Sequence, residues 1–262
     1  PDTSIPVPAA ETLQYLKQSY GELAWLINAH AANQPDRIAL DDGEEQLTWG
    51  QTASLVKRIA AQLQAEALQK GQAVSILGTT TIRYALVYLG AIAAGGCAAP
   101  LTTSATPRQL AAMMTDSGAG HLFIDHAKRA ELADSGVALP VLKHVMMDAP
   151  DDSDGAPFLF DWMAEEGATP RDVETGPNDP YNIIYSSGTT GTPKGIVHSR
   201  QMRWHQMAVG EESELGMPGQ VTLLSTPMYS NTTLGIFVAT MAYGGTAVVM
   251  RKFDCARWLE LA

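Results

Sequence analysis

The segment Ser187-Gly188-Thr189-Thr190-Gly191-Thr192-Pro193-Lys194-Gly195 decides how the rest of the chain is interpreted. It combines glycines, several hydroxyl side chains and one lysine. Glycine lets backbone N–H groups approach oxygen anions closely, hydroxyls supply short donors, and lysine supplies a positive point charge. These residue types in one loop predict a binding site for a polyphosphate.

The residues on both sides of this loop predict two strands. Tyr181–Tyr185 precedes the loop and Ile196–His198 follows it, and both segments are rich in β-branched or aromatic residues. The nucleotide-binding loop G-x-x-x-x-G-K-[ST] leads instead from a strand directly into a helix. Pro193 precedes the lysine and Gly195 follows it, where that motif requires glycine and a hydroxyl residue. The Walker-type loop is therefore excluded, and the pattern G-x-G-x-x-G is also absent here.

The residues from Tyr185 to Gly195 resemble the phosphate loop of the adenylate-forming superfamily. This superfamily includes acyl- and aryl-CoA synthetases, firefly-type luciferases and the adenylation domains of peptide synthetases. Other stretches resemble family landmarks upstream and downstream of the loop: Leu47-Thr48-Trp49, Lys70-Gly71-Gln72, Gly95-Gly96 before Pro100-Leu101, and Pro227-Met228-Tyr229. The resemblance implies an α/β fold with two similar subdomains and mainly parallel sheets, the truncated N-terminal domain of an adenylate-forming enzyme.

The resemblance also implies a reaction and roles for the loop residues. A carboxylate attacks the α-phosphate of ATP with Mg²⁺, and in the CoA ligases a thiol then displaces AMP. Lys194 would contact the β- and γ-phosphates and help pyrophosphate leave, and Thr189 would reach Mg²⁺, so both are the predicted catalytic residues. The predicted nucleotide-binding residues are Ser186, Ser187, Gly188, Thr189, Thr190, Gly191, Thr192 and Lys194.

The segment Tyr229-Ser230-Asn231 is a candidate acid-binding site. It follows a predicted buried strand at Val221–Ser225, and ligands gather at the carboxyl ends of parallel strands. Many CoA ligases have an aromatic residue and a histidine here, whereas this chain has Ser230 at the histidine position, so no substrate preference is transferred. An ordinary loop with Asn231 or Thr232 as helix cap explains the segment equally well.

Helix and strand signals alternate before Asp148, which predicts βαβ units. Two capping boxes, Thr48–Gln51 and Thr106–Gln109, open helices, and Gly118 stands where the second should stop. The remaining predicted elements are a helix at 82–94 and strands at 73–77, 97–101, 121–124 and 141–147. We divide the chain into a first α/β subdomain (1–147), an acidic proline-rich connector (148–180) and a second α/β subdomain with the phosphate loop (181–262).

Part of the first subdomain recurs in the second. Gly71-Gln72 precedes a strand and a helix that ends at Gly95-Gly96, and Gly219-Gln220 and Gly244-Gly245 stand at nearly the same spacing. Glycine is common after helices, so convergence is one explanation. Two landmarks kept in register over a whole βαβ unit favour duplicated halves.

Charge and cysteine content narrow the function classes. The net charge of −11 arises largely from acidic residues between Asp148 and Pro180. The sequence has no basic stripe that could neutralise the phosphates of a nucleic acid, so we do not expect nucleic-acid binding. The basic residues Arg200 and Arg203 are predicted on the solvated face of a helix; the alternative is that they strengthen the positive field near the phosphates. The two cysteines, Cys97 and Cys255, predict a reducing compartment rather than a disulfide framework, so we expect a cytoplasmic protein. Apolar runs near membrane-span length are broken by glycine pairs, which argues against a transmembrane segment.

A predicted helix that begins after Asp254 has barely two turns before Ala262. We therefore expect a piece of a longer domain that is inactive alone. The leading hypothesis is the N-terminal part of an acyl- or aryl-CoA ligase that uses ATP, Mg²⁺, coenzyme A and a small carboxylic acid and forms a homodimer. The alternatives are an adenylation domain that loads a carrier-protein thiol and a non-catalytic nucleotide-binding module.

Overall fold

A computed structural model describes residues 10–140, 143–150, 155–186, 193–210 and 217–261. The chain forms two compact units that interleave along the sequence. Unit 1 contains the N-terminal segment through Leu55, Thr80–Ile82, and the segment from Arg200 onward. Unit 2 contains Val56–Thr79 and Arg83–Ser199. These units follow contacts rather than chain order, and our sequential division at 147 and 180 stays a prediction.

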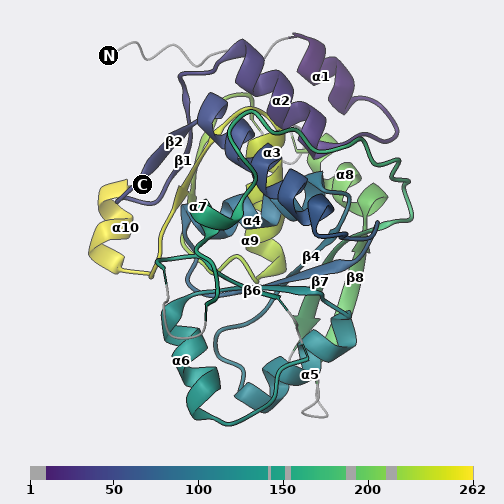
Figure 1. Cartoon of the computed structure of the whole chain (residues 1–262). Helices are drawn as coiled ribbons and strands as arrows, with labels where there is room; N and C mark the ends of the chain where they lie inside the picture. Colours follow the sequence, from purple (N-terminus) through teal and green to yellow (C-terminus); the bar gives the residue numbers. More distant parts are fainter. Residues whose placement is uncertain (1–9, 141–142, 151–154, 187–192, 211–216, 262) are drawn as a thin grey trace. The chain divides into compact units, whose positions relative to one another are not determined.

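Unit 2 is built on a six-stranded sheet with the order β6-β5-β3-β4-β7-β8. Its strands are β3 (Ala73–Leu77), β4 (Cys97–Pro100), β5 (His121–Ile124), β6 (Lys143–Met146), β7 (Pro180–Ser186) and β8 (Lys194–Ser199). Its helices are α4 (Ile82–Ala93), α5 (Pro107–Ser117), α6 (His126–Asp134), α7 (Leu159–Trp162) and most of α3 (Trp49–Ala65). All neighbouring strands are parallel except the β7–β8 pair. Figure 1 labels several of these elements, with α5 near β7 and β8.

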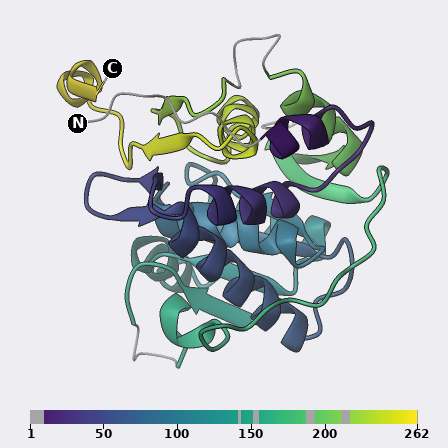
Figure 2. The same cartoon turned by 90° about the horizontal axis from the view of Figure 1, so that it is seen from above.

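Unit 1 is built on a four-stranded sheet with the order β2-β1-β10-β9. Its strands are β1 (Ile38–Asp41), β2 (Gln46–Thr48), β9 (Val221–Leu224) and β10 (Thr246–Val249). Its helices are α1 (Ala10–Leu16), α2 (Leu23–Asn33), α8 (Arg200–Ala208), α9 (Asn231–Ala242) and α10 (Cys255–Leu261), the last drawn in yellow in Figure 2. β10 is parallel to both β1 and β9, so an N-terminal strand completes the sheet of the second half.

The helix boundaries follow from local capping chemistry. Thr48 and Gln51 exchange side-chain and backbone bonds at the start of α3, and Thr106 and Gln109 do the same at α5. Gly118 ends α5 with φ 64° and ψ 28°, the left-handed geometry that glycine adopts without strain. Both predicted capping boxes and the predicted helix stop are confirmed.

The core of unit 2 lies around its central strands. Every residue of β3, β4 and β5 is buried, as expected for parallel strands covered on both faces. The acidic segment after Asp148 is fastened to this unit by apolar residues, because Leu159, Trp162 and Met163 are buried. The predicted mixed α/β fold with mainly parallel sheets is therefore confirmed.

One strand differs from expectation. We predicted a buried strand at 221–225, and β9 has the right place, but only Leu224 is buried. Val221 is 69% exposed because β9 is the last strand in its sheet's order. An apolar run predicts a strand, and its neighbours decide how deeply the strand is buried.

Candidate functional site

The predicted phosphate loop is framed by an antiparallel hairpin. β7 and β8 pair from Asn182 and His198 up to Ser186 and Lys194. The predicted strand–loop–strand arrangement is confirmed by this pairing. Six predicted site residues between the two strands lie outside the described residues: Ser187, Gly188, Thr189, Thr190, Gly191 and Thr192. Ser186 and Lys194 are thus the predicted nucleotide-binding residues that the structure places.

Ser186 and Lys194 face each other across the end of the hairpin. They are register partners, and directly opposite residues of an antiparallel pair project on the same face. Both are exposed. A hydroxyl donor and an ammonium donor therefore stand side by side at the mouth of the loop, where an anionic ligand could receive bonds from both.

The next register pair, Tyr185 and Gly195, projects on the other face of the hairpin. The Tyr185 hydroxyl donates to Asp116 Oδ2 at 2.9 Å and to the Met113 carbonyl at 2.8 Å, both on α5. Burial, and next the bond to Asp116, raise the pKa of Tyr185. Sequence reasoning gave Asp116 no role, because nothing local links it to a tyrosine so distant in the chain.

The candidate acid-binding residues belong to unit 1. Tyr229 and Ser230 are partly exposed and Asn231 is exposed, at the start of α9. Ser230 holds the N-cap position without a side-chain capping bond, so the alternative with Asn231 as cap is wrong. Asn231 Oδ1 instead accepts a bond of 2.8 Å from Arg203 Nη2. The hydrogen bond from Arg203 on α8 thus orients the side chain of Asn231.

The two arginines of α8 contradict the prediction of a solvated face. Arg200 is 3% exposed and Arg203 is 0% exposed. Arg200 forms an ion pair of 2.7 Å with Glu22, and Arg203 also donates to Gln206 Oε1 at 2.8 Å. Neighbouring Trp204 is buried on the same helix, so its packing carries the arginine stems inside, where polar partners satisfy the guanidinium groups.

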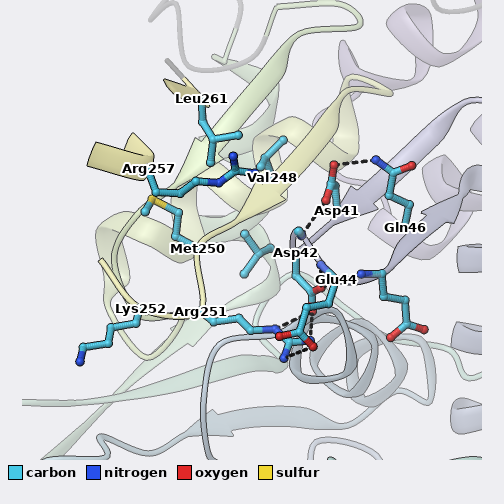
Figure 3. A pocket seen from close by; sticks show the side chains of 13 residues that line it. Asp41, Asp42, Glu44, Gln46, Val248, Met250, Arg251, Lys252, Arg257 and Leu261 are labelled. Carbon is cyan, nitrogen blue, oxygen red and sulfur yellow. Dashed lines mark hydrogen bonds and ion pairs between the residues drawn. The ribbon is translucent and has the colours of Figure 1, made fainter. Parts of the chain in front are cut away.

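An open pocket of about 670 Å³ lies elsewhere in unit 1, between the β1–β2 turn and the segment from β10 to α10 (Figure 3). Its central ion pair joins Asp42 and Arg251 at 3.0 Å, and Arg251 also pairs with Glu44 at 2.7 Å. Burial favours a higher pKa for Asp42, but hydrogen bonds from the Ile82 N–H and from Arg251 outweigh it and lower that pKa. These three charged side chains are paired with one another, so we interpret them as an ion-pair cluster that stabilises the fold rather than as a ligand-binding site.

The described residues bear on two further predictions. None of them form a group of three or more histidine, cysteine or carboxylate side chains suited to a metal ion. The predicted magnesium ligand, Thr189, lies outside them, so the Mg²⁺ site stays a prediction. Over the same part of the chain, no helix has the length and apolar character needed to cross a membrane.

Comparison with known proteins places this arrangement in a family. Residues 27–262 match the sequence model of a protein family described as "AMP-binding enzyme". Indoleacetate–CoA ligase of Aromatoleum aromaticum is 27% identical over 89% of this chain and 46% of its own length. Sulfoacetate–CoA ligase of Cupriavidus necator is 30% identical over 93% of this chain and 48% of its own length. The chain therefore spans about half the length of these curated relatives.

Solved structures agree on the fold. A putative long-chain-fatty-acid CoA ligase from Rhodopseudomonas palustris superposes with a TM-score of 0.81 at 20% identity, over 92% of this chain and 60% of that one. The N-terminal domain of FACL13 from Mycobacterium tuberculosis gives 0.79 at 24% identity with the same coverage. The sequence match over most of the chain, with the hairpin that frames the phosphate loop, shows that this chain belongs to the AMP-binding enzyme family.

Proposed function

We propose that this chain carries the phosphate-binding part of an enzyme that activates a carboxylic acid with ATP and transfers the acyl group to coenzyme A. The observation that carries the proposal is the pairing of Ser186 with Lys194 at the open end of the β7–β8 hairpin. Membership of the AMP-binding enzyme family and the curated CoA ligases among its relatives support the same reaction class.

In the first step, a carboxylate oxygen of the acid attacks the α-phosphorus of ATP. The bond from that phosphorus to its bridging oxygen breaks, and pyrophosphate leaves with the electron pair. Lys194 neutralises charge that accumulates on the departing phosphates, and Ser186 donates a hydrogen bond beside it. Phosphoryl-type transfer depends mainly on such positioning and charge stabilisation.

In the second step, the thiolate sulfur of coenzyme A attacks the acyl carbon, and AMP leaves with the former carboxylate oxygen. Mg²⁺, with Thr189 as ligand, remains a prediction, and we derive no step through it. A cytoplasmic location and a homodimer likewise remain predictions.

The decisive experiment uses the polypeptide encoded by the complete reading frame that contains this chain. Lys194→Ala should lower kcat/KM for ATP-dependent pyrophosphate release by about 100-fold, because one preorganised donor to a developing oxyanion contributes that much. Lys17→Ala, at an exposed lysine in unit 1, is the control and should change the rate little. Unchanged adenylate formation in Lys194→Ala contradicts the proposal.

The acyl acceptor needs its own experiment, because one relative favours the carrier-protein alternative. Phosphinothricin tripeptide synthetase PhsB of Streptomyces viridochromogenes is 28% identical over 86% of this chain and 18% of its own length. Pre-formed acyl-adenylate should be consumed by free coenzyme A and not by a phosphopantetheine-bearing carrier protein. The opposite result would assign the adenylation-domain function instead. Adenylate formation without transfer to either thiol would contradict both.

The acid itself is best sought with a panel of different chemistries. The relatives are named for indoleacetate, sulfoacetate and long-chain fatty acids, so their substrates differ in size and charge. Tyr229, Ser230 and Asn231 are the proposed acid-binding residues. Ser230→Ala should therefore change KM for the preferred acid while KM for ATP stays the same. A change in KM for ATP alone would remove these residues from the acid site.

A further inference from the structure

The phosphate-loop hairpin is fastened to α5 by a side chain that the proposed chemistry does not use. Tyr185 immediately precedes Ser186 on β7, and its hydroxyl bonds Asp116 Oδ2 at 2.9 Å and the Met113 carbonyl at 2.8 Å. The tyrosine is the last described β7 residue whose side chain projects toward α5 before the loop begins. This contact therefore joins α5 to the end of β7 that lies next to Ser186.

Gly195, which follows Lys194, makes room for that contact. A Cβ atom at this position would lie 2.9 Å from Asp116 Oδ2, 3.0 Å from Ile183 Cγ2 and 3.1 Å from Tyr185 Cε1. Gly195 does not have a positive φ, so its backbone would accept alanine while its neighbours would not. The glycine is thus explained by the side chains around it, the Tyr185–Asp116 pair together with Ile183, and not by a special turn.

We propose that Tyr185, Asp116 and Gly195 are positioning residues that hold Lys194 and Ser186 at the distance and angle required by nucleotide phosphates. This inference rests on the proposed function and specifies how its site is held. Neighbouring residues of a strand project on opposite faces, so a twist at Tyr185 or Gly195 displaces Ser186 or Lys194 directly. A displacement of about 1 Å is enough to lower a catalytic rate substantially.

The chemistry of the Tyr185–Asp116 contact suits a hydrogen bond that does not depend on pH near neutrality. Because burial and Asp116 raise the pKa of Tyr185, its hydroxyl keeps its proton and remains a donor at neutral pH. Asp116 is exposed, so its carboxylate has access to water as well as to the tyrosine. The pair therefore acts through geometry, and its removal should leave the pH profile of the reaction unchanged.

The test measures KM for ATP, KM for the acid and kcat in the polypeptide encoded by the complete reading frame. Tyr185→Phe and Gly195→Ala should each raise KM for ATP about 10-fold and leave KM for the acid unchanged. Asp116→Asn keeps an oxygen acceptor for the tyrosine and should fall between wild type and Asp116→Ala. Thr115→Ala, at the exposed α5 residue beside Asp116, is the matched control and should resemble wild type.

A double variant separates positioning from general destabilisation. Asp116→Ala removes the atom that a Cβ at Gly195 would meet first, whereas Ile183 Cγ2 and Tyr185 Cε1 stay in place, so adding Gly195→Ala to it should raise KM for ATP less than Gly195→Ala does in the wild-type protein. Additive effects of the two substitutions overturn the inference. An equal rise in KM for ATP and in KM for the acid, accompanied by a lower Tm, also overturns the inference.

The proposed function and this inference fail in different ways. If Lys194→Ala leaves adenylate formation unchanged, the proposed function is wrong and the inference falls with it. If Lys194→Ala lowers adenylate formation while Tyr185→Phe and Gly195→Ala keep the wild-type KM for ATP, the function stands and the positioning role is wrong.

Discussion

The two glycine-bounded repeats, β3–α4–β4 in unit 2 and β9–α9–β10 in unit 1, share their internal bonding and differ in their surroundings. Gln72 Oε1 accepts from the Gln69 N–H at 3.0 Å, and Gln220 Oε1 accepts from the Met217 N–H at 2.9 Å. The two strands of each repeat are parallel neighbours in the same sheet. Corresponding turns are therefore closed by the same side chain in the same way, which favours duplicated halves.

The surroundings of the two repeats differ because their first strands, β3 and β9, occupy different positions in their sheets. β3 lies between β4 and β5, and all its residues are buried. β9 is the last strand in its sheet's order, and its burial falls from Leu224 at 2% exposed to Val221 at 69% exposed. The comparison teaches that local bonding follows the sequence of the repeat, whereas burial depends on which strand comes to lie beside it.

The largest expected contrast lies between the first strands of the two repeats. Ile76→Ala should lower the free energy of unfolding by about 3 kcal/mol, because Ile76 is 0% exposed and its loss leaves a cavity. Val221→Ala should change it by less than about 0.5 kcal/mol. Urea unfolding with an unchanged m-value measures both. Equal losses would show that β9 is as well covered as β3.

The second contrast lies at the glycine that opens the last strand of each repeat. A Cβ at Gly245 would overlap the Gln220 carbonyl oxygen, a backbone atom. At Gly96, the nearest atom would be Leu68 Cδ2 at 2.9 Å, the end of a flexible side chain, and the nearest backbone atom, the Ala91 carbonyl oxygen, would be farther away at 3.0 Å. Gly245→Ala should therefore cost about 3 kcal/mol of stability and Gly96→Ala about 1 kcal/mol. Thermal unfolding of the two variants checks the order, and a larger effect at Gly96 would contradict it.

The third contrast concerns the glutamines that close the turns. Gln220 Nε2 also donates to Thr222 Oγ1 at 3.0 Å and to Thr240 Oγ1 at 3.4 Å. Gln220→Ala should therefore cost about 3 kcal/mol and Gln72→Ala about 1 kcal/mol, at roughly 1 kcal/mol for each net hydrogen bond. Gln220→Glu, which keeps only the acceptor, is the intermediate variant. Equal losses for both alanine variants would show that the threonine bonds contribute nothing.

The smallest contrast is a pH dependence that arises at the second glycine pair of one repeat. His30 Nε2 bonds the Ala242 carbonyl at 2.9 Å near the turn at Gly244, whereas the equivalent Gly95 has Val173 as its close neighbour. Burial lowers the pKa of His30 from its ordinary value of 6.5, although the bond to Ala242 opposes this. The unfolded chain therefore binds more protons, and stability is full above pH 6.5 and is lost as pH falls toward the lowered pKa.

His30→Gln keeps an N–H donor and removes the titration. Wild type should lose more stability than this variant between about pH 7.5 and about pH 5, as measured by urea midpoints. The buried histidines of unit 2, His121 and His198, are present in both proteins, so any effect of theirs cancels. Parallel pH profiles for the two proteins would remove His30 as the cause.

Much of the fold was predictable because its signals are local. The capping box at Thr106, the helix stop at Gly118 and the strand His121–Ile124 were all predicted and are confirmed. Propensity, capping and hydrophobic runs each act within a few residues, so a single sequence displays them. The residues that frame the phosphate loop, Ser186 and Lys194, were predictable for the same reason.

Other features were hidden because they depend on partners far away in the chain. Arg203 was assigned to a solvated face, yet it is buried against Gln206 and Asn231. The hydrogen bond between Tyr185 and Asp116 joins two segments that are far apart in the chain, and the sequence of neither segment indicates the other as its partner. A polar residue is stable in the interior only when bonded partners surround it, and those partners are assembled by folding.

Local sequence patterns were therefore enough to predict the family and many of the helices and strands after Thr48, because each of these depends on residues that are neighbours in the chain. Tertiary structure decided that β9 is exposed, that Arg200 and Arg203 are interior, and that α5 supports the phosphate-loop hairpin. The physical reason is that burial and long-range hydrogen bonds are properties of contacts between segments, which a local pattern does not specify.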